Sequence, residues 1–256
     1  MKILRWLHTI YAAIIFVITF LFFFPAFWVL SWKKSWHGYS YRLNTFWGWL
    51  FMSLAFIRVD IEDRNKRPYA RPCVYVANHF SYADISSMPL IATDGCFVGK
   101  HTIARAPLFG YYFRSLHIAV NRNSVRSRAR VLELSIETLR RGHSLFIFPE
   151  GGIRTANPPY QEKYKDGAFV AAIRTGVPVV PVTLASNWRL LPDDGRLLLR
   201  GNHMKIVVHE AISTDKMTEE DVPALREKVF NTIQEELLAQ NSAYLPAAAR
   251  QVVVST

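Results

Sequence analysis

After Asp60, short apolar runs alternate with amphipathic stretches, and this alternation constrains the fold more than any other feature of the sequence. Apolar runs of roughly four to eight residues, bounded by polar or turn-forming residues, are typical of buried β-strands. Strands that alternate with helices build a parallel or mixed sheet with helices on both faces. We therefore expect an α/β fold with a mixed, largely parallel sheet flanked by helices. The predicted strands are residues 73–77, 96–99, 117–120, 144–148, 178–184 and 204–209.

Two of the intervening stretches have a clear helical period. The first ends at Gly142, a residue that often stops helices, and the second is preceded by Thr218 and Asp221, which resemble a capping box. We expect the apolar residues of each stretch to form one buried face. In the first stretch they are Val125, Leu132, Ile136 and Leu139; in the second they are Val222, Leu225, Val229, Ile233 and Leu237.

The N-terminal region is apolar enough to enter a membrane. Between Ile10 and Leu30 the only polar or helix-breaking residues are Thr19 and Pro25, and about 20 apolar residues suffice for a helix to cross the hydrocarbon layer. Basic residues on both sides of this run leave its orientation undecided. They are Lys2, Arg5, Lys33 and Lys34.

A second apolar segment, residues 46–57, is rich in aromatic side chains and short for a span, so it is predicted to be an interfacial helix. Two arrangements remain open: a true span followed by an interfacial helix, or a helical pair that enters one leaflet and returns. The alternative is that both helices belong to a soluble core. We predict three parts: a membrane-embedded anchor of two helices at 1–58, an α/β domain at 59–240 and a flexible tail at 241–256.

The net charge of the chain indicates which classes of molecule it can bind. The chain carries a net charge of +11, which favours phosphate-bearing partners such as anionic lipid, an anionic substrate or nucleic acid. The apolar N-terminus favours lipid, and the sequence lacks a Lys/Arg helix stripe or an RNA-type aromatic signature, so nucleic acid is not expected as a partner. Cys73 and Cys96 form neither a disulfide framework nor a zinc-type pair, and we expect both to be buried hydrophobic residues.

Residues 78–84, which directly follow the first predicted strand, contain a histidine and an aspartate five positions apart. A histidine can take a proton near neutral pH, and a carboxylate can hold it in the useful tautomer. Residues five apart on a helix point roughly 140° away from each other. His79 and Asp84 can therefore pair only if the chain turns between them and Asp84 begins a helix. The alternative is that Asp84 only caps that helix and His79 is an incidental loop residue.

A second cluster, residues 148–154, follows the predicted strand 144–148. Its glycine pair allows close backbone approach to a ligand, and Arg154 can bind a phosphate in bidentate fashion; the alternative is a solvated turn. Lys100 and Arg122 add cations at the ends of two further predicted strands. Because ligands bind beyond the carboxyl ends of strands in open α/β sheets, we expect both clusters at one edge.

In order and spacing, these clusters resemble the phospholipid-synthesis acyltransferases related to bacterial 1-acylglycerol-3-phosphate acyltransferase. The resemblance covers roughly residues 60–210 and includes the His-x4-Asp pattern. The matching residues are Asn78, His79 and Asp84 in the first block, Lys100, Pro107, Gly110 and Arg122 in the second, residues 148–151 in the third, and Val180, Pro181 and Val182 in the fourth. In the third block, Gly152 and Ile153 move Arg154 one place later than the family pattern; Asn121 and Thr102 stand where acidic residues are frequent.

The resemblance implies a glycerol-3-phosphate acyltransferase-like fold and transfer of a fatty acyl group to 1-acyl-sn-glycerol-3-phosphate, which gives phosphatidic acid. The donor would be an acyl-CoA or acyl-carrier-protein thioester, with no metal and no other cofactor. In this hypothesis His79 is the general base and Asp84 orients it. The predicted substrate-binding residues are Glu150, Gly151, Gly152 and Arg154 for the acceptor, with Lys100 and Arg122 for phosphate or donor contact.

Three other interpretations stay open. The acceptor could be a different lysolipid, the protein could be a membrane-anchored thioesterase or lipid hydrolase, or it could be a basic binding protein without activity. We expect a cell-membrane location, in a bacterium the inner membrane. Because thioester donors are soluble, the catalytic domain is expected on the cytoplasmic side. The oligomeric state does not follow from the sequence.

Overall fold

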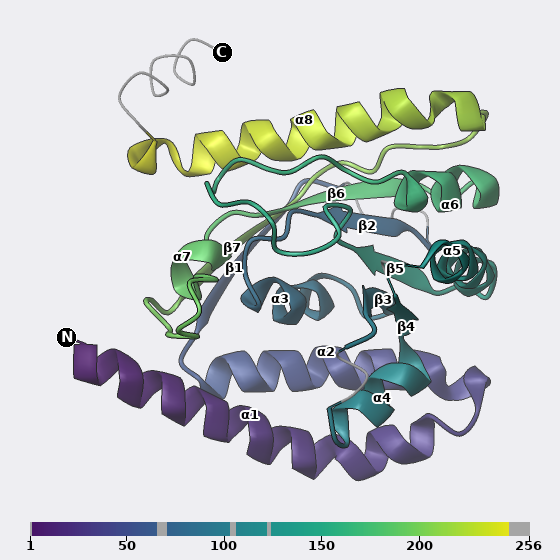
Figure 1. Ribbon diagram of the computed structural model, residues 1–256. Coiled ribbons are helices and arrows are strands. Elements are labelled where there is room, and N and C mark those ends of the chain that lie inside the picture. The colour runs from purple at the N-terminus through teal and green to yellow at the C-terminus, as the bar shows by residue number, and fades with distance from the viewer. Residues whose placement is uncertain (1, 66–70, 103–105, 122–123, 246–256) are drawn as a thin grey trace.

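Seven strands form one mixed sheet at the centre of the protein, in the order β1-β7-β6-β2-β5-β3-β4 (Figure 1). The computed structural model describes residues 2–65, 71–102, 106–121 and 124–245. Strand β6 pairs with β7 in antiparallel fashion, whereas every other neighbouring pair of strands is parallel. The strands are β1 (Arg58–Asp63), β2 (Val74–Ala77), β3 (Gly95–Lys100), β4 (Ile118–Val120), β5 (Ser144–Ile147), β6 (Val179–Leu184) and β7 (His203–Val208).

The predicted fold class is confirmed, and each of the six predicted strands is present. The prediction missed β1, which lies at the edge of the sheet and pairs with β7. Asp60 and Glu62 interrupt its apolar pattern, since an edge strand keeps one face in solvent and carries charged side chains there.

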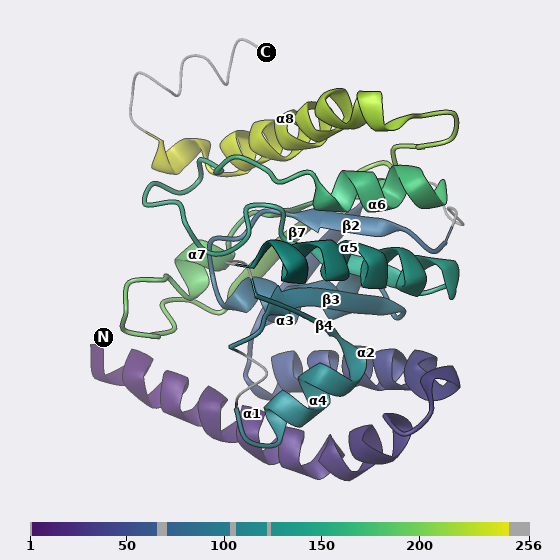
Figure 2. The same ribbon diagram turned by 45° about the vertical axis from the view of Figure 1, so that its right-hand side comes forward.

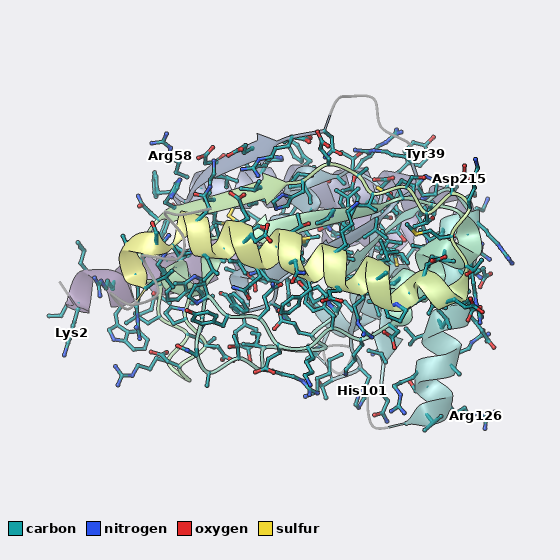
Figure 3. All side chains as sticks on the ribbon, turned by 90° about the horizontal axis from the view of Figure 1, so that it is seen from above. Lys2, Tyr39, Arg58, His101, Arg126 and Asp215 are labelled. Atoms are coloured by element: carbon teal, nitrogen blue, oxygen red, sulfur yellow. The ribbon has the colours of Figure 1, made fainter. Side chains whose placement is uncertain are left out.

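Helices cover both faces of the sheet (Figures 1 and 2). One face carries α5, α6 and α8, and the other carries α3 with the N-terminal helical pair beneath it. The helices are α1 (Lys2–Leu30), α2 (His37–Leu54), α3 (Ala83–Ile91), α4 (Phe109–Leu116), α5 (Val125–Arg140), α6 (Gly167–Thr175), α7 (Asn187–Leu190) and α8 (Val222–Gln240). Seen from above, Arg126 near the start of α5 and His101 just after β3 lie along the same side of the molecule (Figure 3).

The buried face predicted for the last helix is confirmed residue by residue in α8. The predicted capping box is also present: Thr218 and Asp221 bond reciprocally around a short 3₁₀ turn that leads into α8. The face predicted for α5 is only partly right. Leu139 is buried and Leu132 and Ile136 are half-buried, but Val125 is 72% exposed because it occupies the first turn of the helix.

The N-terminal helices pack as a pair against the α/β domain. Trp47 of α2 donates from Nε1 to Thr19 Oγ1 of α1 at 2.9 Å. Phe20 and Phe27 of α1 belong to the same hydrophobic core as the central strands, so no linker separates the two predicted parts. Helix α1 is the one helix in the described part of the chain that is long and apolar enough to cross a membrane.

Two boundaries differ from the prediction. Helix α2 begins at His37 instead of residue 46 and ends at Leu54, where the chain turns through Phe56 at φ +56° and enters β1. Within the predicted tail, residues 241–245 pack against the domain. Asn241 is buried and donates to the carbonyls of Ala185 and Leu237, and Leu245 is 1% exposed. Residues 246–256 lie outside the described residues.

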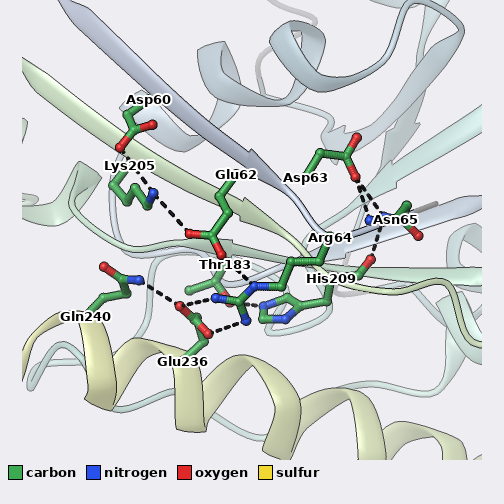
Figure 4. A network of polar contacts seen from close by, with 10 residues as sticks. All are labelled: Asp60, Glu62, Asp63, Arg64, Asn65, Thr183, Lys205, His209, Glu236 and Gln240. Carbon is green, nitrogen blue, oxygen red and sulfur yellow. Dashed lines mark hydrogen bonds and ion pairs between the residues drawn. The ribbon is translucent and has the colours of Figure 1, made fainter. Parts of the chain in front are cut away.

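Ion pairs join the edge of the sheet to α8 (Figure 4). Arg64, just after β1, bonds both oxygens of Glu236 on α8, at 2.7 and 3.1 Å, and also bonds Glu62. Lys205 of β7 lies 3.1 Å from Asp60 and 3.2 Å from Glu62. Asp60 and Glu62, which interrupt the apolar pattern of β1, therefore form ion pairs that link this strand to its neighbours.

Candidate active site

The candidate site lies at the carboxyl ends of adjacent parallel strands. Strand β2 lies between β5 and β6, with Val74 opposite Leu145 on one side and Val179 on the other. The segments that follow β2 and β5 therefore meet at one edge of the sheet. His79 lies on the first of these segments and Glu150 on the second.

The structure brings His79 and Asp84 together. Asp84 is the second residue of α3, and its Oδ2 lies 3.1 Å from Nδ1 of His79. The turn through residues 80–82 produces this contact, as the five-residue spacing required. Because the carboxylate accepts, we assign the proton to Nδ1, which leaves Nε2 with a lone pair that can take a proton.

Asp84 also stabilises the loop that carries the histidine. The same Oδ2 accepts the backbone N–H groups of Phe80 and Ser81, at 2.7 and 2.8 Å. The Ser81 hydroxyl accepts the N–H of Ala83 and donates to the carbonyl of Leu191, as expected for a turn residue. The two interpretations of Asp84, an orienting carboxylate and a structural one, are therefore compatible.

Asn78 connects the end of β2 to the end of β6. Its side-chain oxygen accepts the N–H of Leu184 at 2.8 Å, and its Nδ2 donates to the Leu184 carbonyl at 3.2 Å. Asn78 is fully buried. This reciprocal pair fixes the backbone immediately before His79.

The second cluster surrounds His79 from the other side. The Phe148 ring stacks on the imidazole, with ring centroids 4.2 Å apart and an angle of 17° between the planes. Glu150 Oε1 accepts the backbone N–H of His79 at 2.7 Å, and Oε2 accepts that of Glu162 at 3.3 Å. Burial raises the pKa of Glu150 to about 8, although both hydrogen bonds act in the opposite direction.

The predicted acceptor-binding residues divide into two sets. Glu150 is buried, and each of its carboxylate oxygens already accepts a backbone N–H, so the structure does not present it to a ligand. Gly151 and Gly152 have φ of +79° and +147°, a backbone that L side chains rarely adopt. Arg154 is exposed and forms no hydrogen bond or ion pair with any described residue.

The two weaker predicted cations lie farther along the sheet. Lys100 is exposed and ends β3, which is separated from β2 by β5. The structure therefore places it at the same edge as His79 but two strands away. Arg122 lies outside the described residues.

Two cavities adjoin this edge, and the sequence predicted neither of them. One, of about 330 Å³, lies between the helical pair and helices α3 and α4 and is almost wholly apolar. The other, of about 760 Å³, lies between α5 and α6 and reaches Phe148 and Gly151. Both are assembled from side chains far apart in the chain, so local sequence patterns carry no signal for them. Within the described residues, no three His, Cys, Asp or Glu side chains converge as a metal site.

Comparison with known proteins gives concordant matches. The model of a family described as Acyltransferase matches residues 57–185, just over half of the chain. A 1-acyl-sn-glycerol-3-phosphate acyltransferase of Chlamydomonas reinhardtii is 31% identical over 220 residues, covering 85% of this chain and 65% of that protein. A chloroplastic 1-acyl-sn-glycerol-3-phosphate acyltransferase of Brassica napus is 29% identical, covering 72% of this chain and 52% of that protein.

A solved structure is also similar. The 1-acyl-sn-glycerophosphate acyltransferase from Thermotoga maritima has a TM-score of 0.74 at 26% identity, covering 92% of this chain and 95% of that one. By contrast, this chain spans about half to two thirds of the length of the two curated relatives above. The segment matched by the family contains His79, Asp84 and the whole 148–154 cluster.

Proposed function

The chain belongs to the Acyltransferase family, and we propose that it acylates the free hydroxyl of 1-acyl-sn-glycerol-3-phosphate to give phosphatidic acid. The acyl donor would be a thioester of coenzyme A or of acyl-carrier protein. The observation that carries this proposal is the buried His79–Asp84 pair, 3.1 Å apart at the carboxyl edge of the sheet. The similar protein from Chlamydomonas is a 1-acyl-sn-glycerol-3-phosphate acyltransferase by name and that from Thermotoga a 1-acyl-sn-glycerophosphate acyltransferase, which supports the choice of acceptor.

In the proposed reaction, Nε2 of His79 removes the proton of the acceptor hydroxyl as its oxygen attacks the thioester carbonyl. A C–O bond forms and the C–S bond breaks, so the electron pair leaves with sulfur. The imidazolium then returns its proton to the thiolate, giving a free thiol. Asp84 stabilises the imidazolium between these steps, as the acid of a catalytic triad does, while the nucleophile comes from the substrate.

The cations at this edge suit a phosphorylated acceptor. Arg154 is exposed without a partner among the described residues, so its guanidinium is available to a phosphate. The neighbouring glycines allow the backbone to approach the same group closely. We assign Arg154, with Gly151 and Gly152, to the acceptor, and Lys100 and Arg122 to the phosphate or the donor.

The helical pair supports attachment to a membrane. The outer face of α1 is lined by exposed apolar side chains, including Ile3, Leu7, Ile10, Ile18, Phe22 and Trp28. Helix α1 runs alongside α2 beneath the α/β domain (Figure 1) and also contacts α4. This packing along the domain favours a pair lying in one leaflet over a helix that crosses the bilayer. We propose a membrane location with the site facing the soluble thioester donor, on the cytoplasmic side of a bacterial inner membrane.

The test is a matrix of donors and acceptors with the purified protein in lipid. Radiolabelled acyl-CoA and acyl-carrier protein are each supplied with lysophosphatidate or with a lysolipid of another head group. The proposal predicts labelled phosphatidic acid as the main product. Free fatty acid as the sole product indicates a hydrolase, and acylation of only another lysolipid assigns a different acceptor; either outcome contradicts the proposal.

A further inference from the structure

We propose that Glu150 is a positioning residue that fixes His79 for proton transfer and does not bind the acceptor. This inference rests on the proposed acyl transfer. It follows from the direction in which the structure points the Glu150 carboxylate, toward the backbone of the histidine segment. The neighbouring Arg154 keeps the acceptor role.

Burial, together with its two hydrogen bonds, keeps Glu150 away from a ligand. One oxygen accepts the N–H of His79 at 2.7 Å and the other accepts that of Glu162 at 3.3 Å. The residue is 1% exposed. The direction of these bonds and the burial of the side chain agree that Glu150 faces the protein.

Glu150 completes a set of three restraints on His79. Asp84 holds the Nδ1 edge of the ring, Phe148 covers one ring face at 4.2 Å, and Glu150 holds the backbone N–H. A general base must lie within hydrogen-bond reach of the proton that it removes. A displacement of about 1 Å can cost roughly a hundredfold in rate, so loss of the backbone restraint should lower turnover.

Glu150 also bonds to two segments that are far apart in the chain. Its second oxygen binds Glu162, at the far end of the loop that begins with Gly151 and carries Arg154. A backbone bond from Lys165 to the Pro149 carbonyl, at 3.0 Å, closes the base of this loop. The carboxyl group therefore sets the distance between the base and the loop assigned to the acceptor.

The two hydrogen bonds also identify the informative variants. The short bond to His79 needs only one carbonyl-type oxygen, which Glu150→Gln retains, whereas the Gln amide cannot accept from Glu162. Glu150→Ala removes both acceptors and leaves the buried N–H of His79 without its partner, along with the N–H of Glu162. We expect Glu150→Ala to lower kcat about a hundredfold, with the KM for lysophosphatidate unchanged within about twofold. Glu150→Gln should restore most of the lost kcat.

Arg154→Ala is the matched contrast on the same loop. It should raise the KM for lysophosphatidate about tenfold or more, because a charge-assisted contact to phosphate is lost, with little change in kcat. A raised KM with unchanged kcat in Glu150→Ala would assign Glu150 to the acceptor and overturn the inference. Thermal unfolding of each variant separates these effects from loss of the fold, and Glu150→Gln keeps the test open if the alanine variant does not fold.

A double-mutant cycle tests whether Glu150 acts through His79. In a His79→Ala background, Glu150→Ala should cost no further activity, because the group that it positions is already absent. A second, multiplicative loss would contradict the inference. If the unaltered protein forms no phosphatidic acid, the proposed function is wrong, but the inference about Glu150 can still be tested. The same variants are then compared on the reaction that the protein does catalyse, where Glu150→Ala should again lower kcat and leave KM unchanged.

Discussion

At Asp84 a single oxygen accepts three hydrogen bonds, one from His79 and two from the backbone. Asn at this position retains an oxygen for the two backbone N–H groups. Because the same oxygen faces Nδ1 of His79, the neutral amide keeps this geometry but cannot stabilise the imidazolium that forms when His79 takes the proton. We expect Asp84→Asn to lower kcat by about 10²- to 10⁴-fold.

The matched control for Asp84→Asn is Asp215→Asn, on an exposed loop away from the site, which should keep full activity. The measurement is steady-state formation of phosphatidic acid by the two variants. Normal turnover in Asp84→Asn would reduce Asp84 to a structural residue of the loop.

At the residue scale, the sequence predicted contacts that depend on nearby positions. His79 and Asp84 are five residues apart, so spacing and helix geometry stated the condition for pairing, a turn with Asp84 at a helix start, and the structure meets it. The direction of Glu150 was not predictable, because it depends on how β2 and β5 pair and on the path of the loop back to Glu162. The family resemblance suggested that Glu150 binds the acceptor, whereas in the structure its carboxyl group accepts the backbone N–H groups of His79 and Glu162.

The helical pair determines how membrane attachment should be tested. Deletion of residues 1–58 would uncover α3 and remove Arg58, the first residue of β1, so loss of the fold would obscure loss of the anchor. Charges on the exposed face of α1 avoid this problem. Phe22 and Ile18 are 76% and 57% exposed there, so their replacement leaves the core intact.

We expect Phe22→Glu and Ile18→Glu each to weaken binding to lipid vesicles by a factor of about 30 or more, since burying a charge in the apolar layer costs about 2–3 kcal/mol. Asn231→Glu adds the same charge on the exposed side of α8 and should bind normally. Vesicle flotation measures the difference. Equal binding by all three variants would contradict attachment through α1.

At the element scale, apolar runs predicted the central strands well because those strands are buried on both faces. Strand β1 was missed because its outer residues serve ion pairs with Lys205 and Arg64 (Figure 4). The start of α2 was placed too late because residues 37–45 are mostly polar or small. That first half of the helix is held by tertiary contacts, such as the bond from Tyr41 to the Leu116 carbonyl at 2.9 Å.

For the whole molecule, buried histidines determine the response to acid. Burial lowers the pKa of His117 to about 3 and that of His209 to about 4, against 6.5 in an unfolded chain. Below about pH 6.5 the unfolded chain therefore binds protons that the folded chain does not, and stability falls as pH falls. Glu150 has the opposite effect, because burial raises its pKa to about 8 from 4.5. Its contribution to stability rises as pH falls from about 8 to 4.5, where the folded chain binds a proton that the unfolded chain does not.

Burial also lowers the pKa of His37 and His143. Below about pH 6.5 these four histidines outweigh the one carboxyl with a raised pKa, so we predict the maximum of stability at about pH 6.5–7. We expect the Tm to fall from pH 6.5 to pH 5, and a His209→Gln variant to show a shallower fall. Thermal scans across this range, in buffers of equal ionic strength, measure it. A Tm that is constant or rises toward pH 5 would contradict neutral, buried histidines.

For the whole chain, the family could be predicted because its sequence motifs occur in order. Four blocks over roughly residues 60–210 predicted the family, which the match to residues 57–185 confirms. These motifs do not predict how the helical pair packs against the α/β domain. That contact depends on side chains such as Phe27 and Trp47, whose apolar character alone is equally consistent with lipid.

The central claim, that His79 is the base of an acyl transfer, is tested most directly by His79→Ala. Its rate of phosphatidic acid formation is compared with that of His203→Ala, an exposed histidine at the start of β7, after both variants are shown to unfold at the normal temperature and to bind vesicles. The prediction is a loss of about 10²- to 10⁴-fold in His79→Ala alone. An undiminished rate in His79→Ala would contradict it.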